Sequence, residues 1–249
     1  MLKEERLDFI LQKLKTNQSV KLESLSADLN VSEDTIRRDI EFLSCKGLLL
    51  KVRGGAVPHS PNARSFKERI HVSERDKQAV AKKAFALVEP GQTILLDGGT
   101  TTYTLATMIP QNFKLTVITN NIPIAAVLMD HPHTEVILAG GRIFKNSQVT
   151  VGVETIRMLQ QIRVDTCFIG ICSLHHELGV STPDYDETEV KRIMVQQANK
   201  VVAVTTQNKI GTAESYKVCD IGAVHTIITE TNPAEKLFAA YKKLGIHII

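Results

Sequence analysis

Two adjacent arginines near the amino end lie in a pattern typical of a DNA-binding helix. Residues 31–39 read Val-Ser-Glu-Asp-Thr-Ile-Arg-Arg-Asp. Ser32 can accept a hydrogen bond from a backbone N–H, and Asp34 complements the positive end of a helix that starts there. The apolar residues that follow at helical spacing are Ile36, Ile40 and Leu43. Arg38 lies about 200° around the helix from that apolar face, so its guanidinium can point outward, where it matches the two acceptors of guanine.

The alternative for the two arginines is a solvated helix face, on which they pair with Asp34, Asp39 or Glu41. We favour DNA contact because the arginines fall on the third helix of a compact unit, where a recognition helix enters the major groove. Arg38 is expected to contact a base edge, whereas Thr35, Arg37, Lys51 and Arg53 are expected to contact phosphates. The residues predicted at the DNA interface are Ser32, Asp34, Thr35, Arg37, Arg38, Lys51 and Arg53.

Apolar spacing predicts the elements that must position this helix. Leucine and isoleucine recur at helical intervals over residues 7–14 and again over residues 22–29, which predicts two helices upstream. Residues 48–53 are typical of a short hairpin whose turn or exit uses Gly54-Gly55, and this hairpin would supply a basic wing. Residues 1–57 are therefore predicted to form a winged helix-turn-helix domain.

The rest of the chain alternates apolar runs with helical segments, which predicts a mainly parallel sheet covered by helices. Pro58 and Pro61 place a linker at 58–74, and a helix from about Ser73 leads into an α/β domain over 75–249. The expected strands are 93–96, 115–118, 135–138, 166–169, 201–204, 226–228 and 246–249. The expected helices lie near 102–108, 122–129, 154–161, 187–198 and 234–244.

The residues that follow these strands are small and polar, and parallel sheets bind ligands beyond the carboxyl ends of their strands. Glycine lets backbone N–H groups approach an anion, and a helix start favours phosphate. The alternative is that glycine and threonine only build tight turns and helix caps. Dinucleotide and Walker patterns are absent, which disfavours nicotinamide cofactors and ATP. The residues predicted around a small phosphorylated ligand are Asp97, Gly98, Gly99, Thr100, Thr101, Thr102, Thr119, Asn120, Asn121, Gly140, Gly141 and Gly170.

Charged residues complete this predicted site. Lys191 and Lys209 can supply cations for a phosphate, whereas Asp97 and either Glu187 or Glu189 can accept hydrogen bonds from sugar hydroxyls. Glu187 and Lys191 stand four residues apart, so a surface ion pair on one helix is an equally good explanation for them.

Composition limits the class of protein. The net charge of +3 is too small to indicate DNA binding alone, but residues 59–83 hold seven Lys and Arg against three Asp and Glu. This basic surplus is consistent with a linker that faces phosphate or with an exposed, solvated segment. No apolar run approaches the length of a membrane span, so we expect a cytoplasmic protein with no membrane partner. Four scattered cysteines and two histidine pairs lack metal-ligand spacing. We therefore expect no metal, no cofactor and no catalytic residue.

The Ser-x-x-Thr-Ile-Arg-Arg-Asp run followed by Gly-Gly-Ala resembles the DeoR family of bacterial transcription regulators over residues 6–57. The resemblance extends through Asp97-Gly-Gly-Thr-Thr-Thr, Thr119-Asn-Asn, Gly140-Gly141, the acidic run at 186–192 and Lys209-Ile-Gly. The chain departs from the family pattern at Asn208 and Ile210, in a Ser-Lys-Phe-Gly motif, and at Thr188, in a Glu-Ala-Glu motif. The resemblance implies an N-terminal winged helix-turn-helix domain followed by a mainly parallel α/β sensor domain, similar in fold to ribose-5-phosphate isomerase.

The resemblance also implies a function. We expect a repressor of a sugar or related carbon metabolism operon that binds double-stranded operator DNA as a homodimer or higher homo-oligomer, and whose effector is a phosphorylated sugar. One alternative is a sugar-phosphate isomerase with an appended DNA-binding module, since fold kinship does not decide function. Another is a nucleoid-type DNA binder that has no effector.

Overall fold

Apolar residues at helical spacing form the small N-terminal domain, as predicted. In this computed structural model, which describes residues 2–60 and 65–249, three helices enclose a core that includes Ile10, Leu25 and Ile36. The helices are α1 (Lys3–Asn17), α2 (Leu22–Leu29) and α3 (Glu33–Cys45). Asn30 caps α2 in the left-handed conformation, which explains the sharp turn into α3.

The predicted hairpin is present and gains a third strand. Its strands are β1 (Val20–Lys21), β2 (Leu50–Val52) and β3 (Gly55–Val57), with β3 in the middle. Gly54 has a φ of +80° at the turn, and a Cβ on Gly55 would lie 1.9 Å from the carbonyl oxygen of Val20. Only glycine fits at Gly55, because a backbone carbonyl cannot move aside there.

A salt bridge fixes α1 against α3. Arg6 donates from Nε to Asp39 Oδ2 at 2.7 Å and from a terminal nitrogen to Oδ1 at 3.1 Å. Asp39 is buried, so this carboxylate is not available to the arginines of α3. The bidentate geometry makes it one of the stronger polar contacts of the domain.

The second domain is built on a seven-stranded sheet in which every neighbouring pair is parallel. All seven predicted strands are present, and the observed bounds differ from the prediction by a few residues at most. In spatial order the strands are β15 (His247–Ile248), β14 (Thr226–Ile228), β12 (Ala198–Val204), β9 (Val164–Gly170), β4 (Thr93–Leu96), β5 (Leu115–Thr119) and β6 (Thr134–Leu138).

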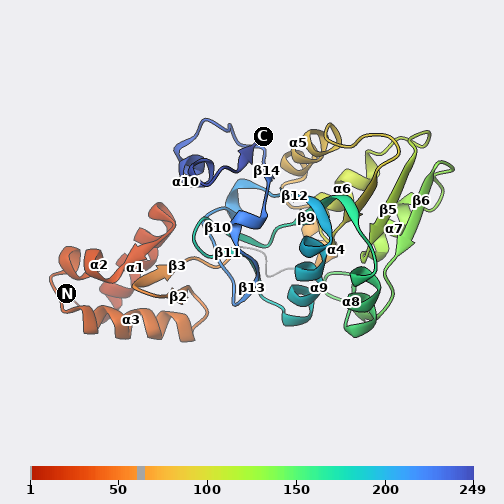
Figure 1. Ribbon diagram of the computed structural model, residues 1–249. Helices are drawn as coiled ribbons and strands as arrows, with labels where there is room; N and C mark the ends of the chain where they lie inside the picture. The colour runs from red at the N-terminus through yellow and green to blue at the C-terminus, as the bar shows by residue number, and fades with distance from the viewer. Residues whose placement is uncertain (1, 61–64) are drawn as a thin grey trace.

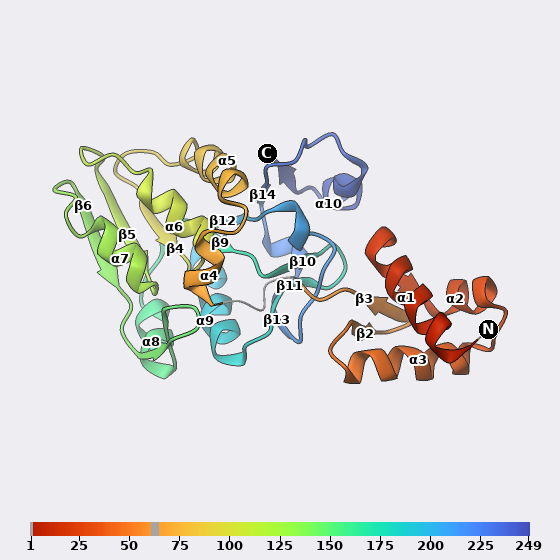
Figure 2. The same cartoon turned by 180° about the vertical axis from the view of Figure 1, so that it is seen from behind.

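Helices cover both faces of this sheet (Figures 1 and 2). One face packs against α5 (Glu74–Phe85), α6 (Thr100–Thr107) and α7 (Ile122–Leu128). The other face packs against α8 (Val153–Gln160), α9 (Tyr185–Gln196) and α10 (Ala239–Lys243). No helix within the described part of the chain has both the length and the apolar content to span a membrane.

Short elements that the sequence did not predict lie around this framework. They are the hairpin of β7 (Arg142–Phe144) and β8 (Val149–Val151), a small sheet of β10 (Ser173–His175), β11 (Gly179–Thr182) and β13 (Tyr216–Cys219), and the helix α4 (Phe66–Ile70). The 3₁₀ helices are η1 (Gln207–Lys209), η2 (Ile221–Ala223) and η3 (Lys236–Phe238). Each has five residues or fewer, so its hydrophobic period is too short to be recognised.

The predicted linker contacts the second domain instead of lying free in solvent. Ser60 donates its backbone N–H to Glu214 at 2.9 Å, and Phe66 donates its N–H to the carbonyl of Asn146 at 2.7 Å. Pro58 is part of this contact, whereas Pro61 lies outside the described residues. Because α4 belongs to the linker, the linker brings its own basic side chains against the sheet domain.

Candidate nucleic-acid interface and anion site

Ser32 is the N-cap of α3, as the sequence predicted. Its hydroxyl oxygen accepts a hydrogen bond from the backbone N–H of Thr35 at 3.3 Å and lies 3.0 Å from the hydroxyl of Thr35. Both groups are therefore used at the helix start. Contact of Ser32 and Thr35 with phosphate stays a prediction.

The two arginines of α3 differ in whether their guanidinium groups form an ion pair. Arg37 pairs with Asp34 at 2.7 Å on the exposed surface, which fits the solvated-face alternative for that side chain. Arg38 is exposed and forms no hydrogen bond or ion pair among the described residues. Exposed pairs contribute little energy, so Arg37 can exchange Asp34 for phosphate at small cost. Arg38 has no such partner to release before it contacts DNA.

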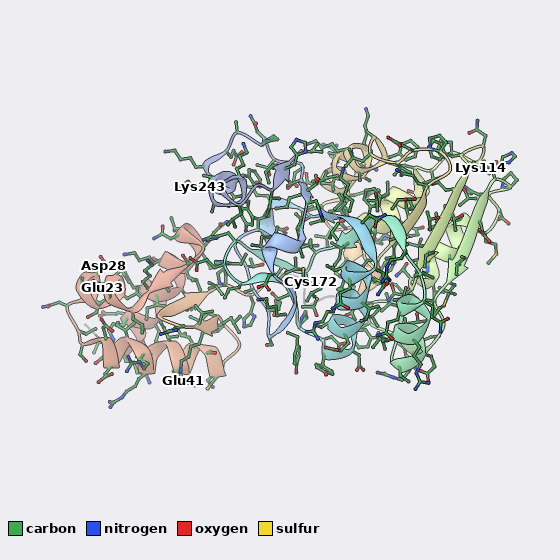
Figure 3. All side chains as sticks on the ribbon, viewed as in Figure 1. Glu23, Asp28, Glu41, Lys114, Cys172 and Lys243 are labelled. Atoms are coloured by element: carbon green, nitrogen blue, oxygen red, sulfur yellow. The ribbon has the colours of Figure 1, made fainter. Side chains whose placement is uncertain are left out.

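The wing offers one paired cation and one unpaired cation. Lys51 forms an ion pair with Glu41, and Glu41 lies along α3 (Figure 3). Arg53, at the tip of the hairpin, is exposed and has no polar partner within the residues that the structure describes. The sequence did not single out Phe42, whose ring lies 4.3 Å from the ammonium of Lys3.

A closed polar cluster lies at the carboxyl edge of the sheet. The carboxylate of Asp97, directly after β4, forms an ion pair with Lys191 of α9 and accepts the backbone N–H of Gly170 at 2.8 Å. The ammonium of Lys191 also donates to the carbonyl of Gly170 at 3.0 Å. Both side chains are at most 3% exposed. Burial by itself lowers the pKa of Lys191, but the charge of Asp97 opposes burial and the pKa is raised above its ordinary value, so Lys191 stays charged beside Asp97.

The two candidate glutamates of α9 lie in different surroundings. Glu187 accepts a hydrogen bond from the hydroxyl of Ser147 at 3.1 Å, and burial raises the pKa of its carboxyl group. Glu189 pairs instead with Arg192 beside β13, because it lies about 200° around the helix from Glu187. The structure thus does not bring Glu189 to the edge formed by Asp97. The alternative of a surface pair between Glu187 and Lys191 is wrong, since Lys191 is buried against Asp97.

Several of the predicted hydroxyl and amide groups are used in holding the loops. The hydroxyl of Thr102 donates to Gly99 O at 2.9 Å, and that of Thr119 donates to Leu96 O at 2.6 Å. Asn121 caps α7 by accepting the N–H of Ile124 at 3.0 Å. For these side chains the turn-and-cap explanation describes what they do in the structure.

Glycines let these loops approach one another closely. A Cβ on Gly98 would lie 2.1 Å from a methyl group of Val149, and a Cβ on Gly170 would lie 3.2 Å from a carboxylate oxygen of Asp97. Gly140 and Gly141 are exposed beyond β6, where the hydroxyl of Thr155 donates to Gly140 O at 2.6 Å. Gly98, Gly141 and Gly170 therefore serve close packing at the sheet edge, whereas a Cβ on Gly140 would meet nothing within 4 Å.

Three polar groups at this edge remain without partners among the described residues. They are the hydroxyls of Thr100 and Thr101, in the first turn of α6, and the side-chain oxygen of Asn120, which is buried and accepts no hydrogen bond. A helix N-terminus carries free N–H groups and partial positive charge. Together these groups can bind an anion and a hydroxyl donor.

Three cations lie near one another, and none of them forms an ion pair with a carboxylate among the described residues, although the charge of Glu74 acts on Lys77. Lys209 donates only to the carbonyl of Ile171, at 2.8 Å, and Lys77 donates only to backbone carbonyls of α4. The Nε of Arg69 is buried and has no hydrogen-bond partner in the described residues. Burial, with repulsion between Arg69 and each lysine, lowers the pKa of Lys77 and of Lys209 to about 8. We call Arg69, Lys77 and Lys209 the cation cluster.

The side chain of Cys172 indicates where the cluster meets the sheet. Cys172 lies in the turn after β9, near the middle of the molecule (Figure 3). Burial raises the pKa of its thiol, while the charges of Lys191, Lys209 and Arg69 lower it. Lys191, Lys209 and Arg69 therefore lie close enough to Cys172 for their charges to act on its thiol.

The sequence identified Lys209 but missed Arg69 and Lys77. The only available signal was the basic surplus at residues 59–83, which contains both. Its location in the linker favoured contact with DNA phosphate or solvent. The structure instead places both residues on α4 and α5, facing the sheet domain.

Comparison with known proteins agrees with this two-part architecture. Residues 6–62 match the family described as DeoR-like helix-turn-helix domain, and residues 72–231 match the DeoR C terminal sensor domain. The chain belongs to the DeoR family. This DeoR-family protein is thus a DNA-binding transcriptional regulator.

Curated proteins that align with this chain over nearly their whole length are transcriptional regulators. A putative aga operon transcriptional repressor of Escherichia coli O157:H7 is 31% identical over 98% of this chain and 93% of its own length. The regulator GolR of Listeria innocua is 32% identical over 98% and 97%, and the repressor GlcR of Bacillus subtilis is 30% identical over 100% and 96%.

The family and these relatives are regulators rather than enzymes, so the isomerase alternative is not adopted. Among solved structures, a ribose 5-phosphate isomerase of Methanocaldococcus jannaschii aligns with 55% of this chain and 54% of its own, at 19% identity and a TM-score of 0.40. A likeness of this extent supports no argument about activity.

Removing the carboxylate of Asp97 should destabilise the sheet domain. Asp97→Ala leaves the buried ammonium of Lys191 without its partner, which costs about 3–5 kcal/mol in comparable buried pairs. The matched control is Asp186→Ala in α9, which breaks an exposed pair with Arg142 and should cost about 0–1 kcal/mol. Urea unfolding of the full chain measures both. Equal losses would show that Lys191 does not depend on Asp97.

Arg38 and Arg53 should affect operator binding in different ways. Arg38→Ala should cost about 1–3 kcal/mol and relax the preference at one base pair, whereas Arg53→Ala should weaken all sequences alike and reduce the salt slope by about 1. Lys114→Ala is the control, because Lys114 is exposed on the sheet domain and outside the predicted DNA interface. Titration of operator variants at several salt concentrations separates these effects. Identical profiles for Arg38→Ala and Arg53→Ala would contradict the assignment.

Proposed function

We propose that this regulator represses a sugar or related carbon metabolism operon and is released from its operator by a small phosphorylated sugar. The observation that carries the proposal is the cation cluster, whose three charges have no carboxylate partner among the described residues. Charges that are partly or fully buried are normally paired, so the lack of an ion pair here supports a mobile anion as the partner of this cluster. The names of the relatives, an aga operon repressor and a lactose phosphotransferase system repressor among them, support the link to sugars.

The phosphate group is assigned to the cation cluster and the first turn of α6. Arg69 offers a planar pair of donors suited to phosphate oxygens, and Lys209 offers a point charge. The hydroxyls of Thr100 and Thr101 and the free N–H groups of α6 add neutral donors. Lys77 forms hydrogen bonds only to carbonyls among the described residues, so below pH 8 its charge adds to the attraction for the anion.

The sugar hydroxyls are assigned to neighbouring acceptors. The unpartnered oxygen of Asn120 and the half-buried carboxyl group of Glu187 lie at the same sheet edge. We propose that Asp97 and Lys191 shape the floor of the site, because their charges are satisfied by each other. The glycine loops at 98–99 and 140–141 would then determine how closely the sugar ring approaches.

Release from DNA requires coupling between two copies of the chain. We propose a homodimer or a higher homo-oligomer, with the DNA-binding domain at residues 1–57, the linker at 58–74 and the effector domain at 75–249. Two recognition helices must lie about 34–36 Å apart, or a multiple of this, to read half-sites one turn apart. A coupling free energy of only about 1.4 kcal/mol already produces a tenfold loss of operator affinity.

Thermal stability tests the effector class. The panel is glucose 6-phosphate, ribose 5-phosphate, glycerol 3-phosphate and inorganic phosphate, each compared with the unphosphorylated sugar or glycerol. A ligand at a hundred times its dissociation constant stabilises by about 2.7 kcal/mol. We expect a phosphorylated compound to stabilise the protein and its unphosphorylated counterpart to have no effect. If no member of the panel stabilises the protein, the remaining alternative is a DNA binder without such an effector.

Replacing Lys209 should remove the effector response and leave operator binding intact. Lys209→Met deletes a charge from the cation cluster without emptying the space it occupies. Lys114→Met is the matched control, because Lys114 is exposed at the far end of the sheet domain (Figure 3). Operator titrations with and without the stabilising compound provide the measurement. Normal release of DNA by the Lys209→Met protein would place the effector elsewhere.

Effector affinity should fall as pH rises above 8. The pKa values of Lys77 and Lys209 are lowered to about 8, so both lysines are charged below that pH and lose their charge above it. A phosphate monoester is a dianion above about pH 6, so affinity should be greatest near pH 7. Calorimetric titration with the stabilising compound across this range is the measurement. An affinity that is equal at pH 7 and pH 9 would contradict the assignment of charges.

A further inference from the structure

One short segment, residues 209–214, contacts the cation cluster, the DNA-binding domain and the linker. Its first residue is Lys209 itself. Ile210 and Ala213 are buried at 1% exposure each, so the segment is part of the packed structure and not a free loop. Residues that belong to both a ligand site and a domain contact can pass a displacement from one to the other.

Hydrogen bonds make this segment rigid. The hydroxyl of Thr212 lies 2.8 Å from the carbonyl of Lys209 and 2.9 Å from the hydroxyl of Ser173. The N–H of Gly211 donates to the carbonyl of Leu174 at 2.7 Å. A movement of Lys209 toward an anion would therefore move Gly211 and its neighbours with it.

The segment touches the DNA-binding domain at Gln18. Gly211 has a φ of +83°, and a Cβ in its place would lie 2.4 Å from the side-chain oxygen of Gln18. Gln18 directly follows α1, which is tied to the recognition helix by the salt bridge of Arg6 and Asp39. Gly211 is thus connected to α3 through Gln18 and α1.

The segment holds the linker through Glu214. One carboxylate oxygen accepts the N–H of Ser60 at 2.9 Å, and the other lies 3.0 Å from Nδ1 of His59. The backbone N–H of Ala213 donates to the carbonyl of Pro58 at 3.2 Å. The Glu214 side chain is 10% exposed, so these bonds are largely shielded from water. They fix the chain immediately after β3 of the wing.

Open space flanks these contacts. One hollow of about 410 Å³ lies between the turn at Arg53–Gly55 and residues 175–178, and another of about 410 Å³ lies between residues 17–19 and α10. In both ribbon views the N-terminal domain faces β10, β11 and α10 across this region (Figures 1 and 2). The orientation of the DNA-binding domain consequently depends on few direct contacts.

We propose that the Glu214 clamp on His59 and Ser60, together with the contact of Gly211 with Gln18, couples the effector site to the orientation of the DNA-binding domain. Anion binding at Lys209 shifts the rigid segment 209–214, and the segment turns the wing and α3 as one body. This inference rests on the proposed function for its effector, but the clamp itself makes a prediction that needs no effector.

The first test compares effector response in Glu214→Ala, His59→Ala and the control Glu235→Ala, a substitution of an exposed glutamate. With the panel compound that stabilises the wild-type protein most, wild type and control should lose operator affinity about tenfold or more, and the two clamp variants less than about threefold. Calorimetry should give the same effector affinity for all four proteins within about twofold. Retention of the full response by both clamp variants would overturn the coupling role.

The second test measures domain orientation without effector. Spin labels are placed at the exposed Cys45 of α3 and at position 114 by Lys114→Cys, in a full-length chain carrying Cys172→Ser and Cys219→Ser. The distance distribution between the labels should be narrow with Glu214 present and clearly broader in Glu214→Ala and His59→Ala. Equally narrow distributions would overturn the clamp. A panel without any binding compound would instead count against the proposed effector, and the distance measurement would still decide the clamp.

Discussion

The need to neutralise buried charge governs the carboxyl edge of the sheet. Asp97 and Lys191 are both almost fully buried, and each satisfies the other together with the backbone of Gly170. Since the carboxylate of Asp97 is used in this way, it cannot also neutralise Arg69, Lys77 or Lys209. Among the described residues the cation cluster forms hydrogen bonds only to backbone carbonyls, and burial together with repulsion lowers the pKa of each lysine to about 8, which weakens its charged form. A bound phosphate would supply the missing counterion and remove the cost of keeping these cations unpaired. The repulsion among the cations in the free protein would thus favour binding of an anion.

The same edge determines how such binding reaches DNA. Lys209 belongs to a rigid segment whose other residues contact Gln18 and the linker. The linker also contributes Arg69 to the cation cluster. One end of the linker therefore belongs to the proposed site, and the other end follows β3 of the wing. An effector that draws these cations together would act on the linker at both ends. The recognition helix follows because the salt bridge of Arg6 with Asp39 joins it to α1.

Much of this architecture could be predicted from local sequence signals. Seven strands, the recognition helix with its Ser32 cap, and the wing follow from hydrophobic period, capping residues and turn glycines, which act over a few residues. Contacts between distant residues could not be predicted in this way. The sequence gives no sign that Asp39 pairs with Arg6, that Glu214 holds His59, or that Arg69 turns toward the sheet. Glu189 is predicted at the site because the run at 186–192 holds three carboxylates, although helical geometry directs Glu189 away from Glu187. Asn121 and Thr119 were predicted as ligand groups, and the structure uses their polar atoms in caps and turns.

The most direct test of the central claim is the ionisation of Lys209 itself. Lysine side chains labelled with ¹³C at Cε report their own titration by nuclear magnetic resonance, and Lys209→Met assigns the signal. The account predicts a pKa of about 8 for Lys209 in the free protein and a rise toward the ordinary value when the stabilising phosphorylated compound binds. A Lys209 that titrates near 10.5 in the free protein, with no change on adding that compound, would contradict the claim that this cation lacks a counterion until the effector arrives.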